Sequence, residues 1–187
     1  MLLAADRGFD ELPVAIGLLR GGSNSRFKSL LDGLKAEGDL ARQEGALTEL
    51  CDLLCMGTEE TLQGFSTDQF LPPLINLINC EASPEIMLQA CRGIAYILEA
   101  IPQASPDVVR HGSIAPLCSK LMAIQYIDVA EQALMTLHKI SKDNSSHSQL
   151  LQNRSVSAVL SYLDFFPLSL CSQSWPHPLP FSPPAYL

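Results

Sequence analysis

One helical pattern of apolar residues occurs three times in this chain, at a spacing of 43 or 44 residues. Four apolar residues between positions 84 and 101 each have an apolar counterpart 43 positions later. The matched pairs are Ile86 and Val129, Ala90 and Ala133, Ile94 and Leu137, and Ile97 and Ile140. Three residues that lie 44 positions earlier extend the pattern toward the amino terminus: Ala46, Leu50 and Leu53. Such a period is typical of arrays of stacked helical repeats.

The order of the predicted helices distinguishes between two kinds of helical array. A short helix around residues 106–111, a turn at Gly112, a middle helix over 113–122 and a long helix over 128–141 follow one another. A HEAT unit has two helices, whereas this order of short, middle and long helices is that of an armadillo unit. We therefore predict an all-α, right-handed, armadillo-like helical solenoid of about three to four repeats.

Helix boundaries in the earlier rounds follow from capping residues, glycine and proline. Four helices of the repeat domain are predicted between residues 27 and 101, over residues 27–38, 40–56, 67–79 and 84–101. Thr67 and Asp68 are expected to cap the third of these helices, and Ser83 is expected to cap the fourth. Pro84 then suits the first helical position, where an amide donor has no partner within the helix.

The last round is predicted to be incomplete. It has a short helix around 149–153 and a middle helix over 155–165, and six of the 13 prolines follow within the last 21 residues. Each interior proline costs a helix roughly 3 kcal/mol. The round therefore lacks a long helix, and we expect an apolar face to be left partly uncovered. The residues of this face are Val156, Leu160 and Leu163.

These patterns divide the chain into three parts. Residues 1–25 form an amino-terminal extension and linker that ends in a glycine- and serine-rich stretch, with a short helix near residues 12–19. Residues 26–166 form the repeat domain. Residues 167–187 form a proline-rich tail that we expect to be disordered.

Charge and cysteine usage restrict the classes of partner. The formal net charge is −8 and no basic patch is evident, so nucleic acid and anionic membranes are not expected as partners. The six cysteines include no C-x-x-C pair, and most of them lie among apolar residues of predicted helices. A reducing, intracellular location in the nucleus or the cytoplasm, or in both, is therefore expected. No run of about 18 apolar residues suggests a membrane helix.

Several short runs resemble the armadillo region of the HECT ubiquitin-protein ligases, the class of the ubiquitin-fusion-degradation and thyroid-receptor-interacting ligases. The runs read KAEGD, CMGTEETL, DVAEQAL and LSYLDFF, at residues 35–39, 55–62, 128–134 and 160–166. The likeness covers about residues 27–166 and departs at residues 153–155, where the family has a glycine turn. With its proline-rich tail, the chain looks like a fragment of such a ligase, the product of an alternative transcript, or the product of an inaccurate gene model.

The resemblance implies a role in substrate recruitment. In that family the repeat array helps to hold protein substrates, and a carboxy-terminal HECT domain accepts ubiquitin on a cysteine and transfers it to a substrate lysine. The chain has no room for that domain, so none of its cysteines is assigned that role and the ubiquitin machinery would act only through the missing domain. A non-catalytic scaffold or decoy with the same partners is the first alternative. An import-adaptor-like carrier is the second.

Candidate binding residues lie on the exposed faces of the long helices, which line the groove of an armadillo array. The first row is Glu85, Gln89, Arg92 and Tyr96, and the second, 43 positions later, is Asp128, Gln132, Met135 and Lys139. These side chains could hydrogen-bond an extended peptide backbone. The alternative is that they form an ordinary solvated surface, which is the commoner use of such positions.

No independent catalytic or metal site is predicted, and no cofactor is expected. The four histidines are scattered, and none pairs with another at i, i+4 beside a carboxylate. His138 occupies the array position of Ala95 and Cys51, so we interpret it as a partly buried or capping residue. Glu59 and Glu60 resemble paired catalytic carboxylates, but their place at a helix start is explained by the helix dipole.

Overall fold

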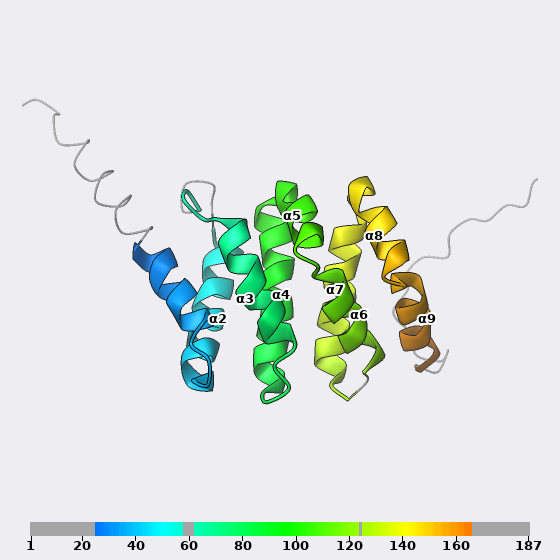
Figure 1. Cartoon of the computed structure of the whole chain (residues 1–187), viewed down its shortest axis with the longest axis horizontal. Coiled ribbons are helices and arrows are strands. Elements are labelled where there is room, and N and C mark those ends of the chain that lie inside the picture. The colour runs from blue at the N-terminus through cyan, green and yellow to red at the C-terminus, as the bar shows by residue number, and fades with distance from the viewer. Residues whose placement is uncertain (1–24, 58–61, 124, 166–187) are drawn as a thin grey trace, which may run out of the picture.

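The described part of the chain forms one row of helices. The computed structural model describes residues 25–57, 62–123 and 125–165, and within these ranges every regular element is helical. The helices stand side by side along the long axis of the molecule (Figure 1). The chain is thus an all-α helical repeat solenoid. The predicted tail 167–187 and the predicted helix near residues 12–19 lie outside the described residues, so the division into three parts stays a prediction.

The repeating unit contains short, middle and long helices. The long helices are α2 (Leu40–Cys55), α4 (Pro84–Ala100) and α7 (Ile127–Ser141). The middle helices are the helix over residues 25–34, α3 (Thr67–Ile78), α6 (Ile114–Met122) and α9 (Ser155–Phe165). The short segments are η1 (Pro102–Ala104) with α5 (Ser105–Arg110), and η2 (Asn144–Ser146) with α8 (His147–Gln152). The fourth round ends, within the described residues, at its middle helix.

The long and middle helices form two layers. Helix α4 packs between α2 and α7, while α3 packs on α4 and α6 packs on α7. In Figure 1 the middle helices α3 and α6 cross in front of the long helices α4 and α7. In this arrangement the neighbouring helices cover the apolar stripe of each helix, which a single unit could not do alone.

The apolar positions predicted from the 43-residue period form the core. All eight members of the four matched pairs are buried, and Ala90 and Ala133 are fully enclosed. Ala46 and Leu50 are buried as predicted. Leu53 is half-buried and packs against the core, and its neighbour Leu54 is the more deeply buried of the two leucines.

Side-chain caps stabilise the first turns of two of the long helices, α4 and α2. The Ser83 side chain accepts a hydrogen bond from the Ile86 amide at 3.3 Å, as predicted for the start of α4. Asp39 caps α2 in the same way, by accepting from the Arg42 amide at 3.0 Å. Each such cap contributes about 1 kcal/mol.

The predicted caps of α3 are wrong. Ser66 is the residue at the N-cap, and no side chain caps this helix. Thr67 instead donates a hydrogen bond to Asp107 Oδ2 of α5 at 3.2 Å. Asp68 accepts one from Arg110 at 2.5 Å, and the His111 ring lies 2.9 Å from the same oxygen. These two side chains therefore connect the second unit to the third and do not close their own helix.

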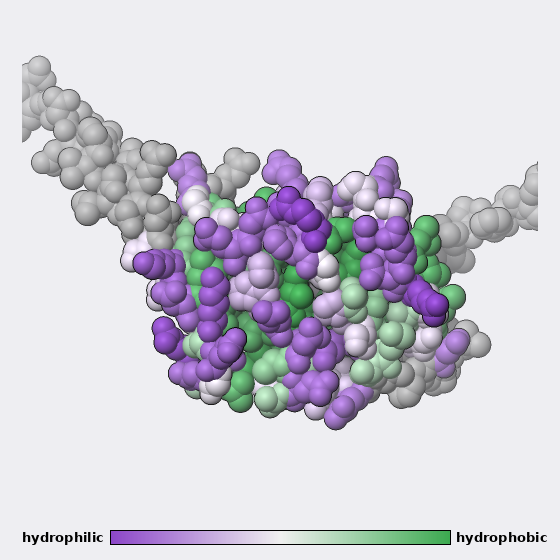
Figure 2. All heavy atoms as spheres, viewed as in Figure 1, coloured by the Kyte–Doolittle hydropathy of each residue, from purple (hydrophilic) through white to green (hydrophobic). Residues whose placement is uncertain are grey.

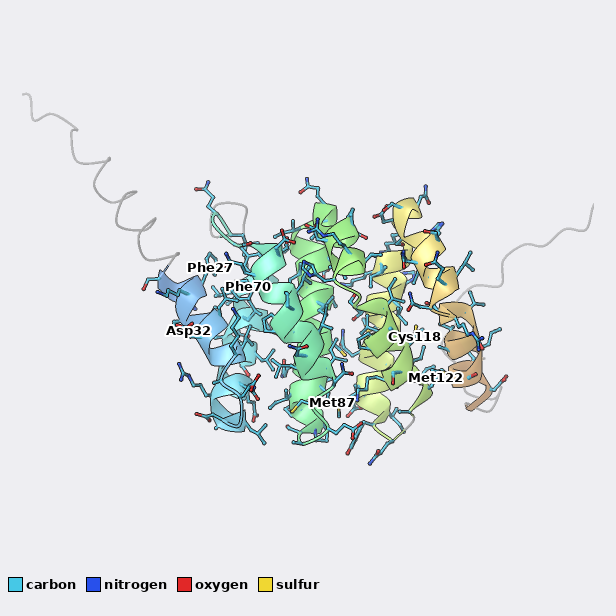
Figure 3. All side chains as sticks on the ribbon, viewed as in Figure 1. Phe27, Asp32, Phe70, Met87, Cys118 and Met122 are labelled. Atoms are coloured by element: carbon cyan, nitrogen blue, oxygen red, sulfur yellow. The ribbon has the colours of Figure 1, made fainter. Side chains whose placement is uncertain are left out.

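Aromatic rings hold the first middle helix on the second unit. The Phe27 ring meets the Phe70 ring edge-on at 6.2 Å between centroids, and Phe65 stacks on Phe70 at 4.5 Å. Figure 3 labels Phe27 and Phe70 close together, on the first middle helix and on α3. The same middle helix lies very close to α2 at Gly33, where a Cβ atom would come within 2.7 Å of the Ala46 Cβ.

Candidate protein-binding surface

The eight candidate residues lie on one face of each of two neighbouring long helices. The α4 row is Glu85, Gln89, Arg92 and Tyr96, and the α7 row is Asp128, Gln132, Met135 and Lys139. Their spacing of four, three and four residues keeps the members of each row on one helical face. All eight are exposed or partly exposed, while the opposite faces of α4 and α7 are buried in the core.

Direct hydrogen bonds hold α4 and α7 side by side. Thr136 donates to the Cys91 carbonyl oxygen at 3.3 Å, and the Lys139 ammonium group donates to the Ala95 carbonyl oxygen at 3.4 Å. Both acceptors belong to α4 and both donors belong to α7, so the two rows run along adjacent helices. The structure therefore brings the two rows together on one surface.

Three of the eight side chains already have partners within the protein. Lys139 forms an ion pair with Glu99 at 2.7 Å, and the Gln89 amide donates to the Glu85 carboxylate at 2.8 Å. The hydrogen bond and the charge of Lys139, with the charge of Lys142, lower the pKa of Glu99. Lys139 thus fastens α7 to α4 as well as facing the surface.

A third row, on α2, was not identified from the sequence. Its members lie 44 residues before the α4 row: Ala41, Gly45, Thr48 and Asp52. All four are exposed, and they line an open hollow of about 580 Å³ together with other α2 residues and Arg26. The 44-residue spacing, which already relates Ala46 to Ala90, was the signal that could have found them.

A second hollow lies at one end of the α7 row. It measures about 370 Å³ and its polar lining includes Glu99, Lys139, Lys142 and Asp143. Hydrogen bonds from the Ser145 hydroxyl and amide lower the pKa of Asp143, which keeps this carboxylate ionised. Charges of both signs therefore surround the hollow.

The described residues offer little for bond-making chemistry. They contain no group of three or more histidine, cysteine or acidic side chains that could hold a metal ion. Burial raises the pKa of Cys91 and of Cys51 to about 12, so neither thiol is a ready nucleophile. Glu59 and Glu60 lie outside the described residues. His138 is exposed, so it is not the partly buried residue of the first alternative, and it lies in the last turn of α7.

Among the helices of the described residues, none is both long enough and apolar enough to pass through a bilayer.

Comparison with known proteins relates this repeat array to one family of ligases. A family model for TRIP12-like E3 ubiquitin-protein ligases, TPR repeats, matches residues 19–149. The E3 ubiquitin-protein ligase UPL3 of Arabidopsis thaliana is 41% identical over 162 residues, which is 85% of this chain and 8% of that protein. TRIP12 of Danio rerio is 42% identical over 148 residues, which is 79% of this chain and 7% of that protein.

A fungal relative gives the same result at lower identity. A probable ubiquitin fusion degradation protein of Schizosaccharomyces pombe is 33% identical over 148 residues, which is 75% of this chain and 9% of that protein. The chain thus spans less than a tenth of the length of these curated relatives. The resemblance seen in the short sequence runs is confirmed. The chain belongs to the TRIP12-like E3 ubiquitin-protein ligase family and corresponds to its helical repeat region.

Proposed function

We propose that this chain is a protein-binding segment of a HECT-type ubiquitin ligase that recruits substrates for ubiquitination and proteasomal degradation. The observation that carries the proposal is the pair of side-chain rows on α4 and α7, set next to each other on a repeat array of the ligase family. The segment itself performs no catalysis. We propose that it acts in the nucleus, the cytoplasm or both.

We also propose that the repeats are of the armadillo type, although the family model describes them as TPR repeats. A TPR unit has about 34 residues and two helices. Here the third unit runs from η1 through α5 and α6 to α7, which makes a short, a middle and a long element. The long helices recur every 43 or 44 residues. Both features support the three-helix type.

The chemistry of the rows suggests the kind of substrate segment that they hold. The α4 and α7 rows offer charges of both signs, two amides, one phenol and one thioether. Such side chains can bond to the backbone of an extended peptide and cover an apolar side chain of it. The net charge of −8 favours a basic segment over an acidic one.

Affinity capture with row variants tests the proposal. The whole chain is used as bait in a cell extract, beside Arg92→Glu and the double variant Gln132→Ala with Met135→Lys. We expect a set of proteins that the unchanged chain retains and both row variants lose. Proteins in this set should also gain ubiquitin when the full-length ligase is expressed and lose it when the ligase is depleted.

The matched control is Lys28→Glu, which reverses an exposed charge on the first middle helix, away from the rows. Its captured proteins should equal those of the unchanged chain. If the row variants capture the same proteins as the control, these rows are ordinary solvated surface. If the captured proteins show no change in ubiquitination with the ligase, the chain is a scaffold or decoy and does not recruit substrates.

A further inference from the structure

The array departs from its own pattern of buried apolar positions on α9 and on α6. On α9 three apolar side chains are exposed, Val156, Leu160 and Leu163, which confirms the expectation of a partly uncovered face. On α6 the departure is of the opposite kind, because a charged side chain is enclosed. That side chain belongs to Lys120.

Lys120 occupies a position at which the neighbouring middle helices have a buried residue that carries no charge. The equivalent residues are Leu77 of α3, 43 positions earlier and 5% exposed, and Tyr162 of α9, 42 positions later and 4% exposed. The Lys120 side chain is itself only 11% exposed. The array therefore encloses most of a lysine where its own repeat pattern predicts a core residue.

The Lys120 ammonium group has little compensation for this burial. Among the described residues its one ion-pair partner is Glu81, whose Oε1 lies 4.0 Å from Lys120 Nζ and whose side chain is 87% exposed. Burial raises the pKa of the enclosed Cys91 thiol to about 12, and the charge of Lys120 is close enough to oppose that rise. A charge in such surroundings gains more from a close partner of opposite charge than an exposed charge does.

A small hollow lies beside Lys120. It measures about 160 Å³, and its lining residues are Glu81, Lys120, Ala123, Gln125, Tyr126 and Val129. It lies at the edge of the array where α3 and α6 end and α4 and α7 begin, which is the lower edge in Figure 1. Figure 2 shows hydrophilic residues at this edge, between the lower ends of α4 and α6. Because Glu81 and Gln125 are exposed, the hollow is open to solvent.

Two more hydrogen-bond donors line the hollow. The Gln125 amide donates to the Tyr126 hydroxyl at 3.3 Å, which leaves the proton of that hydroxyl for another acceptor. The part of the chain that the structure describes places no acceptor within hydrogen-bond distance of this proton. An ammonium group, a phenol and an amide thus line one space, and the acidic side chain in its lining, Glu81, points largely into solvent.

We propose that this hollow binds the carboxylate of an acidic side chain from a partner protein. The carboxylate accepts hydrogen bonds from the Lys120 ammonium group and the Tyr126 hydroxyl, and it displaces the carboxylate of Glu81 toward solvent. Its single negative charge matches the single charge of Lys120, whereas a phosphate would add further negative charge beside Glu81. The volume suits one side chain and is too small for a peptide segment.

A protein is the better source of this carboxylate than a free small acid. One ammonium group in a small hollow binds a free carboxylate weakly, but a side chain gains effective concentration from the segment that carries it. The net charge of −8 does not prevent this binding. Exposed charges beyond about 8 Å are largely screened at physiological ionic strength, and a partly buried charge such as Lys120 is screened much less. The site uses none of the eight residues in the α4 and α7 rows, so it is independent of the role proposed for them.

Two matched probes test the chemistry of the hollow on the whole chain. They are the α-amides of N-acetylglutamate and N-acetylglutamine, which have nearly the same shape and differ in one charge. Nuclear magnetic resonance at constant ionic strength follows the Lys120 ε-methylene group and the Gln125 side-chain amide during each titration. We expect the glutamate probe to shift both signals saturably in the millimolar range, with a Kd at least about ten-fold lower than that of the glutamine probe.

Variants distinguish a ligand site from a structural ion pair. Lys120→Met should abolish the preference for the glutamate probe and should fold, because the equivalent positions in the neighbouring units are buried and uncharged. Glu81→Gln should bind the glutamate probe about five-fold more tightly, because it removes the competing carboxylate. The matched control is Lys28→Met, which removes an exposed lysine of the first middle helix and should bind both probes as the original chain does.

Four results would overturn the proposal. The first is the absence of saturable shifts on both the original and the Glu81→Gln chain. The second is a lower melting temperature of Glu81→Gln without tighter binding, which would make Lys120 and Glu81 a structural pair. The third is tighter binding of inorganic phosphate than of the glutamate probe. The fourth is tighter binding of succinate, because the ligand would then be a free small acid.

Discussion

Arg154 holds the left-handed backbone conformation that Gly112 holds one repeat earlier, with φ values of 55° and 78°. The turns match in their hydrogen bonds as well. The Gly112 amide donates to the Val109 carbonyl at 2.9 Å, and the Arg154 amide donates to the Leu151 carbonyl at 3.1 Å. Each turn connects a short helix to a middle helix. Arg154, a residue with a side chain, therefore adopts at this turn the backbone that glycine adopts one repeat earlier.

Replacing Arg154 with glycine should stabilise the chain. A residue with a Cβ atom pays about 1–2 kcal/mol for the left-handed conformation, whereas glycine adopts it freely but loses more entropy on folding. We expect Arg154→Gly to raise the free energy of unfolding by about 0.5–1 kcal/mol in urea denaturation. The matched control is Gly112→Ala, which should lower the free energy of unfolding by a similar amount. A loss of stability in Arg154→Gly would show that the arginine side chain, and not the backbone, determines this turn.

A charge at the centre of the stack should destabilise the whole array. Ala90 is fully buried on α4, between α2 and α7. We expect Ala90→Asp to cost roughly 3–5 kcal/mol, because an unpaired carboxylate would be enclosed among apolar side chains. Thermal unfolding followed by circular dichroism measures this loss.

Gln132→Ala tests the assignment of helix faces with the opposite expectation. Gln132 lies on the partly exposed face of α7, so its removal should leave the melting temperature within about 1–2 °C of the original while weakening partner binding. Equal losses of stability in Ala90→Asp and Gln132→Ala would mean that the buried and exposed faces have been exchanged.

The sequence predicted the long helices well because their apolar periodicity is strong and repeats three times. At Leu53 the prediction is only partly right, because leucine also stands at position 54, and spacings of 43 and 44 residues place different members of that pair opposite Ile97. Only the packing of α2 on α4 decides between them, and it buries Leu54. When either of two adjacent leucines could face the core, the sequence pattern does not determine how the helix is rotated about its own axis.

Contacts between units were harder to foresee than helices. Thr67 and Asp68 have the residue types of caps, and only the position of α5 shows that they bond to Asp107 and Arg110. The candidate rows could be read from periodicity, since each member repeats at 43 residues. The partner of Lys139 could not, because Glu99 lies 40 residues away and meets it only once α7 lies on α4.

The bridge from Asp68 to α5 should make stability sensitive to acid. The hydrogen bond of His111 and then the charge and hydrogen bond of Arg110 hold the pKa of Asp68 below its usual value. Because the pKa is lower in the folded protein, the stabilisation is complete above about pH 4 and is lost as the pH falls through the lowered pKa. The difference in urea midpoint between the original chain and Asp68→Asn should therefore shrink between pH 6 and pH 3.

Asp32→Asn is the matched control for that titration. Asp32 is an exposed aspartate on the helix over residues 25–34, and the structure gives it no hydrogen bond or ion pair among the described residues (Figure 3). The excess effect of Asp68→Asn over this control measures the bridge alone. A midpoint difference for Asp68→Asn that stays constant or grows toward pH 3 would mean that the bridge does not hold α3 to α5 in solution.

The cysteines should divide into reactive and protected thiols. Cys55 is exposed at the end of α2, whereas Cys51 and Cys91 are buried, and burial raises the pKa of each of these two thiols to about 12. Since the thiolate is the reactive form, a brief treatment with iodoacetamide at pH 8 should modify Cys55 and leave the two buried thiols unmodified. Peptide mapping by mass spectrometry measures the extent at each site, and a sample in 6 M guanidinium chloride gives the fully reactive reference. Modification of Cys91 as rapid as that of Cys55 in the folded chain would show that α4 separates from its neighbours within the time of the reaction, and that the stack of long helices is open in solution.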